Sequence, residues 1–298
     1  MDEVCDYGAP GPLNFAVDDG DWLDEQRGRR ISWNHYRPQH DRPSPLIIYS
    51  HGLGGSRRSG ANWLSHWASW GIGALAIQHP GTDEAAAGDS PLALRHLLRT
   101  AVDDAQLATR QTDLIFALDQ IGAALPGTIF GIAGHSYGAV SALRLIGEQR
   151  GRNDTPADPR VRAAVLFSPS ARGGTQALAL RFSDIRLPCL QLTGSRDDGI
   201  GPGDISAADR CLPHQHMTAT DQHLLVLDGA GHVDLAGQGS GHEAHIRLLK
   251  AATVSFWIAH LQGCARAGHW LENELPQHLA AADRLYRRQG SDGGASPT

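Results

Sequence analysis

The sequence has few cysteines, and they are not clustered. Its four cysteines, Cys5, Cys189, Cys211 and Cys264, lie far apart and form no C-x-x-C pair. This pattern is typical neither of a zinc site nor of a disulfide-rich scaffold. No apolar run approaches the roughly 18 residues that a membrane-spanning helix needs. We therefore expect free thiols and no membrane span.

Concentrated positive charge is also lacking. The chain has 26 Lys and Arg against 32 Asp and Glu, a formal net charge of −6 at pH 7, and its basic residues are scattered. Nucleic acids and anionic lipid surfaces are bound through basic patches, so we expect neither as a partner. Residues 1–4 are not a basic segment leading into an apolar one, so no signal peptide is recognisable and the cytoplasm is the expected location. A signal trimmed from the chain would leave the same picture.

The 298 residues, of which 41% are hydrophobic, are enough to bury a sizeable core. Short apolar runs alternate with helical patterns, which is typical of β-α-β units around a mainly parallel sheet. The expected strands are residues 46–49, 74–77, 128–132, 163–167, 189–192 and 224–227. The tryptophans at 63, 67 and 70 recur at helical spacing and indicate a packed helix face. The fold class predicted is α/β, with helices on both faces of the sheet.

The expected organisation is one main domain with a C-terminal extension. Residues 1–262 form the α/β domain, residues 263–288 a helical extension through which an oligomer could form, and residues 289–298 a disordered tail. Residues 8–21 are polar and rich in Gly, Pro and Asp, so we expect a loop with at most a short edge strand at residues 15–17. The connections between the later strands are short, which leaves no room for a large lid domain.

A candidate nucleophile stands in the G-x-S-x-G match Gly134-His135-Ser136-Tyr137-Gly138. An expected strand enters the motif and an expected helix leaves it, which is the strand–turn–helix context of a nucleophile elbow. There the serine sits at a sharp turn, and the glycines allow backbones to approach where side chains would clash. The sequence therefore predicts Ser136 as the nucleophile.

An alcohol is a weak nucleophile at neutral pH and needs a base, which in turn needs an orienting acid. Two later strands run into such residues: Asp197 and Asp198 follow one, and His232 follows the next through a Gly turn. Asp197 is favoured by its G-x-x-D spacing from Gly194, with Asp198 as the competitor. His232 is favoured over His223, His242 and His245 because it alone follows a strand through such a turn.

Donors for a negatively charged intermediate are expected in Ser50-His51-Gly52-Leu53-Gly54-Gly55-Ser56, an H-G-x-G-G turn after an early strand. The backbone N–H groups of Leu53 and Tyr137 are the candidates for this oxyanion hole. A phosphate-binding loop is the alternative, and the lack of a G-K-[ST] ending in the turn disfavours it. His214-x-His216 and His242-Glu243-x-His245 are not the H-E-x-x-H of a zinc helix, so no metal is expected.

Taken together, these motifs and Gln78-His79-Pro80-Gly81 resemble the α/β-hydrolase superfamily. More narrowly, the chain is similar to dienelactone-hydrolase-like proteins and to the platelet-activating factor acetylhydrolase group, although it has Ser136 where true dienelactone hydrolases have a cysteine. The resemblance implies an α/β-hydrolase fold and a serine esterase that cleaves small acyl esters or an exposed polyester through a Ser-His-Asp acyl-enzyme. It implies neither a metal nor an organic cofactor. His51, Gly52, His79 and Ser168 are candidates for substrate binding.

Two other functions are compatible with the same residues. An acyltransferase or a peptidase could use this nucleophile, since fold and nucleophile do not fix the acceptor. A non-catalytic ligand-binding member of the fold is the third hypothesis. Covalent labelling by a fluorophosphonate separates catalysts from binders, and product analysis with added alcohol or amine separates hydrolysis from transfer.

Overall fold

The computed structural model describes residues 5–88, 103–151, 154–199, 205–219, 221–238 and 243–288. One nine-stranded sheet runs through them in the order β1-β2-β4-β3-β5-β6-β7-β8-β9. Its strands are β1 (Phe15–Asp24), β2 (Arg29–Pro38), β3 (Leu46–Ser50), β4 (Gly73–Ile77), β5 (Phe130–His135), β6 (Val161–Phe167), β7 (Cys189–Arg196), β8 (Gln222–Gly231) and β9 (Arg284–Arg288).

The middle of this sheet is parallel and its two edges are antiparallel. Strands β4, β3, β5, β6, β7 and β8 pair in parallel. The hairpin of β1 and β2 joins β4 in antiparallel register, and β9 pairs with β8 in the same way. Since parallel strands end at one edge, the residues that follow β3, β5, β6, β7 and β8 meet there.

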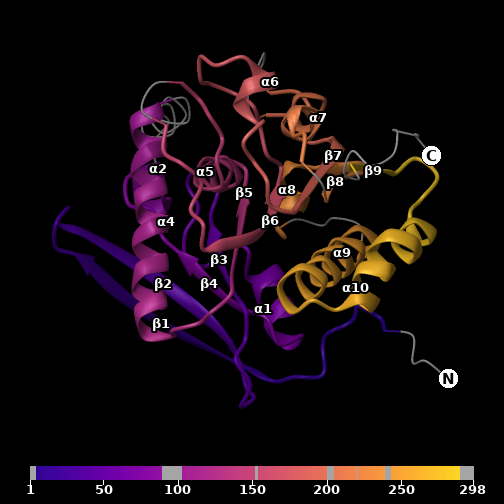
Figure 1. Cartoon of the computed structure of the whole chain (residues 1–298), viewed down its shortest axis with the longest axis horizontal. Coiled ribbons are helices and arrows are strands. Elements are labelled where there is room, and N and C mark those ends of the chain that lie inside the picture. Colours follow the sequence, from indigo (N-terminus) through magenta and orange to yellow (C-terminus); the bar gives the residue numbers. More distant parts are fainter. Residues whose placement is uncertain are drawn as a thin grey trace.

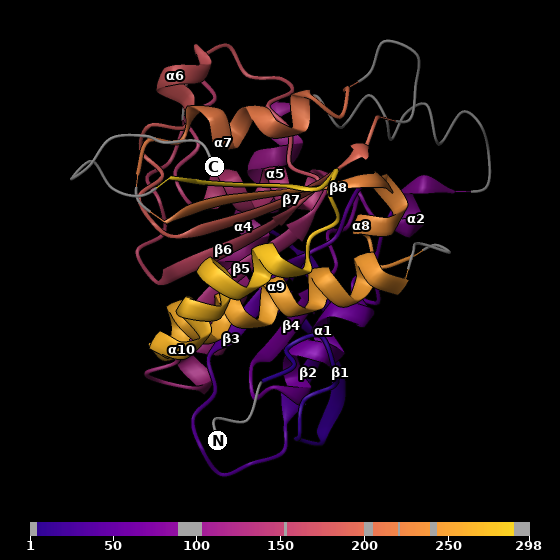
Figure 2. The ribbon, with the colours of Figure 1, turned by 90° about the vertical axis from the view of Figure 1, so that its right-hand side faces the viewer.

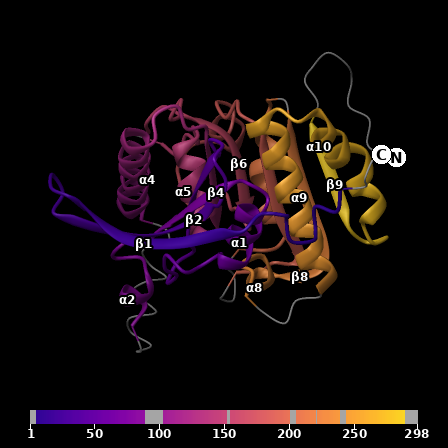
Figure 3. The same cartoon turned by 90° about the horizontal axis from the view of Figure 1, so that it is seen from below.

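Helices cover both faces of the sheet (Figure 1). On one face lie α1 (Ala61–Ser69), α9 (Glu243–Gln262) and α10 (Ala265–His269), and on the other α4 (Asp104–Ala124) and α5 (Tyr137–Leu145). Figure 2 shows α9 and α10 lying across the strands, and Figure 3 shows α4 and α5 separated from α9 by the sheet. This arrangement confirms the fold class predicted from the sequence.

The remaining helical segments are short. They are α2 (Glu84–Ala87), α6 (Leu178–Arg181), η1 (Asp209–Cys211), α7 (Leu212–His216), α8 (His232–Leu235), η2 (Trp270–Glu274) and η3 (Leu275–His278). In the described parts of the connections after β6 and β7, α6, η1 and α7 are the helical segments, and none exceeds five residues. Within the described ranges, no helix is both long and apolar enough to cross a bilayer.

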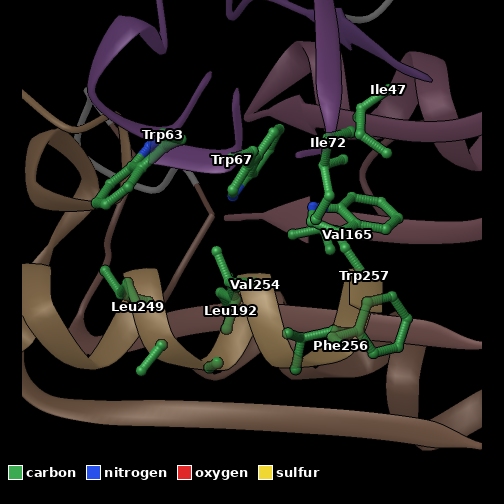
Figure 4. Close-up of a cluster of buried hydrophobic side chains, with 14 of the residues drawn as sticks. Ile47, Trp63, Trp67, Ile72, Val165, Leu192, Leu249, Val254, Phe256 and Trp257 are labelled. Carbon is green, nitrogen blue, oxygen red and sulfur yellow. The ribbon is translucent and has the colours of Figure 1, made fainter. Parts of the chain in front are cut away.

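The core beneath α1 and α9 combines aliphatic side chains with large aromatic ones (Figure 4). Trp63 and Trp67 are fully buried, as the helical spacing indicated. Trp63 stacks on Phe167 with ring centroids 5.4 Å apart, and Trp67 meets Trp257 edge-on at 5.7 Å. The indole N–H of Trp67 donates to Thr253 Oγ1 at 2.9 Å, so its polar atom is satisfied inside the core. This packing fixes α1 and α9 against the strands that lead to the site.

The N-terminal strand is longer than the sequence predicted. Residues 15–17 were expected as at most a short edge strand, whereas β1 spans ten residues, Phe15–Asp24. Its polar side chains are tolerated because the hairpin exposes much of both faces. Gly20 is needed there, since a Cβ would lie 2.6 Å from the Trp33 ring. A strand with so many polar residues shows no regular apolar pattern, so the sequence does not predict it.

The C-terminal extension also differs from the expected helical segment. Helical residues continue from α10 to His278, but residues 284–288 then form β9, which pairs with β8. The side chains along β9 alternate between exposed and half-buried, and Leu285 packs against the main core. The tail expected at 289–298 lies outside the described residues.

Six buried histidines should make the free energy of unfolding depend on pH. Burial lowers the pKa of His66, His79 and His214 to about 4, lowers that of His135 and His223 to about 3, and holds that of His51 well below its usual value. The unfolded chain binds these protons near pH 6.5 but the folded chain does not, so unfolding takes up protons between about pH 6.5 and about 3–4.

We therefore expect the thermal unfolding midpoint to be nearly constant from pH 8 to 7 and to fall steadily from pH 6.5 to 5. Each proton taken up should lower the free energy of unfolding by about 1.4 kcal/mol per pH unit. His66→Gln can still donate to the Tyr7 carbonyl that His66 contacts at 2.9 Å, and should flatten the dependence by about one proton. A midpoint that does not change between pH 7 and 5 would contradict this account.

Candidate active site

Ser136 stands at a strained turn between β5 and α5. Its backbone has φ 55° and ψ −118°, a conformation rare for a residue with a side chain. Its N–H donates to the carbonyl of Phe167 at 2.9 Å, at the end of β6. Strain of this kind costs of order 1–3 kcal/mol and persists where the surrounding structure enforces it. Here it leaves the Ser136 side chain only half-buried at the carboxyl edge of the sheet.

The flanking glycines are required by close backbone contacts. A Cβ on Gly134 would lie 2.4 Å from the carbonyl group of Gly138. A Cβ on Gly138 would lie 2.0 Å from the carbonyl oxygen of Ser50, at the end of β3. The G-x-S-x-G pattern therefore lets α5 begin directly against β3.

Ser136, His232 and Asp197 form an unbroken row of hydrogen bonds. The Oγ of Ser136 lies 3.0 Å from Nε2 of His232, and Nδ1 of His232 lies 2.7 Å from Oδ1 of Asp197. A carboxylate only accepts, so Nδ1 carries the imidazole proton and Nε2 is left to accept from the serine hydroxyl. His232 opens α8, where the N–H of Gly231 donates to Asp234 at 2.8 Å and holds the turn.

The structure brings Asp197, and not Asp198, to His232. Asp197 is fully buried, and its second oxygen accepts from Thr193 Oγ1 at 2.7 Å. Burial would raise the pKa of Asp197, but the hydrogen bond from His232 and the charge of Arg210 outweigh it and keep this pKa below its usual value. Asp198 is exposed and accepts from the N–H of Ala207 instead.

His135 packs directly against His232. Their ring centroids are 4.6 Å apart, and Nε2 of His135 donates to the carbonyl of His232 at 3.1 Å. Burial lowers the pKa of His135 to about 3. His135 is therefore neutral and supports the His232 ring.

Residues 50–56, termed the Gly52 turn here, lie beside the serine. A Cβ on Gly52 would lie 3.5 Å from Ser136 Cβ and 3.1 Å from Nδ1 of His135, so the turn backbone passes close to Ser136. The N–H of Gly54 donates to the carbonyl of Thr82 at 2.9 Å, which pins the turn from the outside. Leu53 is half-buried in this turn, and Tyr137 opens α5 on the other side of Ser136.

A second row of hydrogen-bonded Ser, His and Asp side chains lies beneath this turn and is shielded from solvent. Ser50 Oγ is 3.0 Å from Nε2 of His79, whose Nδ1 is 3.0 Å from Oδ2 of Asp113. All three residues are fully buried. Arg110 donates to Ser50 Oγ at 3.0 Å and to the His51 carbonyl, and its guanidinium lies over the Tyr137 ring at 4.9 Å. This row is a support for the Gly52 turn.

Burial and neighbouring charges hold His79 and Asp113 in one protonation state. Burial, followed by the charge of Arg110, lowers the pKa of His79 to about 4, so His79 is neutral. Burial would raise the pKa of Asp113, but hydrogen bonds from His79 and Arg29 lower it far below its usual value. Arg27 also donates to Asp113, at 2.7 Å. The carboxylate therefore stays ionised and fixes the His79 tautomer.

Three of the four residues expected to bind substrate lie in the protein interior. His51, His79 and Ser168 are fully buried. His51 is bonded to Gly52 and to the His79 N–H, and the Ser168 carbonyl accepts from Arg210 at 3.0 Å. This corrects the sequence-based expectation, because their polar groups face the protein interior. Gly52 alone is half-buried beside Ser136.

Sequence reasoning missed Arg110, Asp113, Thr193 and Arg210. A signal existed for Arg110, since it precedes Leu114 and Leu118 by one and two helical repeats and therefore lies on the buried face of α4. A charge on an apolar face indicates an internal partner. Arg210 offers no such signal, because its segment has no regular periodicity.

The histidine pairs noted in the sequence do not form a metal cluster in the described part of the chain. There, no group of three or more His, Cys, Asp or Glu residues is arranged to hold an ion. His214 is buried, and its Nε2 lies 3.3 Å from the carbonyl of Gln222. His242 lies outside the described residues.

Comparison with known proteins bears on the fold. No known family model and no curated protein sequence matches the chain. Its structure is similar to the PEG-bound complex of a cold-adapted esterase from an Arctic intertidal metagenomic library, with a TM-score of 0.57 and 17% identity over 89% of this chain and 95% of that one. The native structure of a cold-adapted esterase from such a library gives a TM-score of 0.54, also at 17% identity, over 87% and 94% of the two chains. With its strand order and the elbow at Ser136, the chain has the α/β-hydrolase fold.

Proposed function

We propose that this protein is a carboxylic-ester hydrolase in which Ser136 is the nucleophile, His232 the general base and Asp197 the acid that orients it. One observation carries the proposal: the unbroken hydrogen-bonded row from the half-exposed Ser136 to the buried Asp197. The likeness in fold to esterases supports the choice of substrate class.

The reaction follows from the proton positions in this row. As Ser136 Oγ attacks the ester carbonyl carbon, its proton passes to Nε2 of His232, and the carbonyl oxygen becomes an oxyanion. The N–H groups of Leu53 and Tyr137 stabilise that oxyanion. The imidazolium then gives its proton to the departing alcohol, leaving an acyl-enzyme. Water, activated by the same imidazole, releases the acid and restores the serine.

The surroundings of the row favour small acyl esters or esters exposed on a polymer. The side chain of His232 is 18% exposed, and Val233, which follows it, is 60% exposed. In the described parts of the connections after β6 and β7, the helical segments are short. We therefore propose substrates of this kind rather than long triglycerides.

Replacing the nucleophile gives the direct test. Ser136→Ala should lower kcat for a small ester by about 10⁴–10⁶ while the circular dichroism spectrum is retained, because no other group supplies the attacking oxygen. A fluorophosphonate should add to the wild type and to the matched control Ser65→Ala, a half-buried serine of α1 that donates to the Ala61 carbonyl, but not to Ser136→Ala. Residual activity above about a tenth of the wild type would refute the assignment.

The two neighbouring aspartates give a second test. Asp197→Asn should lower kcat by about 10³–10⁴, because the amide can donate to Nδ1 and so favour the wrong imidazole tautomer. Asp198→Asn is the matched control and should retain most of the activity, since its carboxylate is exposed and bonded to Ala207. Equal losses in the two variants, or a larger loss in Asp198→Asn, would contradict the role of Asp197.

A further inference from the structure

A buried arginine lies beside the Asp197–His232 pair. Arg210, in η1, is 3% exposed. Its Nε donates to the Asp197 carbonyl at 3.2 Å and lies 3.5 Å from Asp197 Oδ1, while one terminal nitrogen lies 3.3 Å from Nδ1 of His232. The other terminal nitrogen donates to the Ser168 carbonyl at 3.0 Å. The proposed mechanism does not use this cation.

Arg210 therefore contacts both Asp197 and His232. Nδ1 of His232 already gives its proton to Asp197, so it offers no lone pair to the guanidinium. The 3.3 Å approach instead sets a fixed positive charge beside the ring that becomes positive during the reaction. Asp197 attracts the imidazolium, and Arg210 opposes it.

The other titratable groups near the pair do not replace this charge. Besides the pair and Arg210, the described residues place His135 from β5, Asp234 on α8 and Cys211 there. His135 is neutral, since burial lowers its pKa to about 3. Burial raises the pKa of Cys211, which therefore also stays neutral. The acid Asp234 is bonded to the Gly231 N–H.

We propose that Arg210 is a positioning residue that keeps His232 unprotonated, and hence able to act as a base, at more acidic pH than the Asp197–His232 pair would alone. This inference rests on the proposed function, because it assigns a role to the same base. The two backbone bonds of Arg210 hold its charge at a fixed place, and the burial of the guanidinium keeps solvent from screening it.

The test is the acidic limb of the pH profile in Arg210→Met, which keeps the length of the side chain and removes its charge. The profile of kcat/KM for a small neutral ester should rise from acid to neutral pH in the wild type. In Arg210→Met the midpoint of this rise should move to higher pH by about one unit, the effect of removing one cation a few ångströms from the imidazole.

Arg210→Lys is the matched control. It keeps the charge but not the guanidinium geometry, so its midpoint should stay much closer to that of the wild type even where its maximal rate falls. A purely structural role predicts a different pattern: both variants lose maximal rate and neither midpoint moves. A midpoint in Arg210→Met that stays within about 0.2 units of the wild type would overturn the proposal, as would equal shifts in the two variants.

A second readout is independent of turnover. The titration of the His232 imidazole, followed by NMR in isotopically labelled wild type, Arg210→Met and Arg210→Gln, should show the same upward shift in both uncharged variants. Arg210→Gln serves if Arg210→Met does not fold. If the wild type neither hydrolyses esters nor reacts with a fluorophosphonate, the proposed function fails. The NMR titration still decides the effect of Arg210 in that case, and an unmoved titration overturns it.

Discussion

The contact between Gly138 and the carbonyl of Ser50 sets the geometry of the whole site. Because there is no side chain at Gly138, the first turn of α5 lies directly against the end of β3. This contact fixes Ser136 and the Gly52 turn relative to each other, although they are far apart in the sequence. The strained backbone of Ser136 is then held by the Phe167 carbonyl on the neighbouring strand. Backbone packing, rather than side-chain choice, therefore defines where an electrophile would lie.

Around this contact the protein buries charged side chains as well as apolar ones. Arg110 and Asp113 are fully buried, and Arg210 is 3% exposed. Taking such groups from water costs several kcal/mol each unless their hydrogen bonds are completed. Arg110 completes its own on Ser50, Thr82, Ser141 and the His51 carbonyl. Hydrogen bonds are directional, so these networks specify position more narrowly than apolar contacts of the same area.

The fold and the row of Ser136, His232 and Asp197 were within reach of sequence reasoning, for a physical reason. Buried parallel strands appear as short apolar runs, and a nucleophile elbow needs glycines at set positions. The G-x-x-D spacing also selected Asp197, the residue that the structure brings to His232. The burial of the polar candidates could not be predicted in this way. His51, His79 and Ser168 follow strands as expected, but their side chains point inward, and a motif does not encode that direction.

The strand β9 has a consequence beyond completing the sheet. It lies at one end of the strand order, so its outer backbone groups could pair with another strand. Three of its five residues are arginines, and Arg284 and Arg288 are exposed. Like charges on two such edges repel, which is a common means of preventing sheets from joining edge to edge. The segment that extends the sheet therefore also carries charge that opposes pairing of this edge with a second copy of itself.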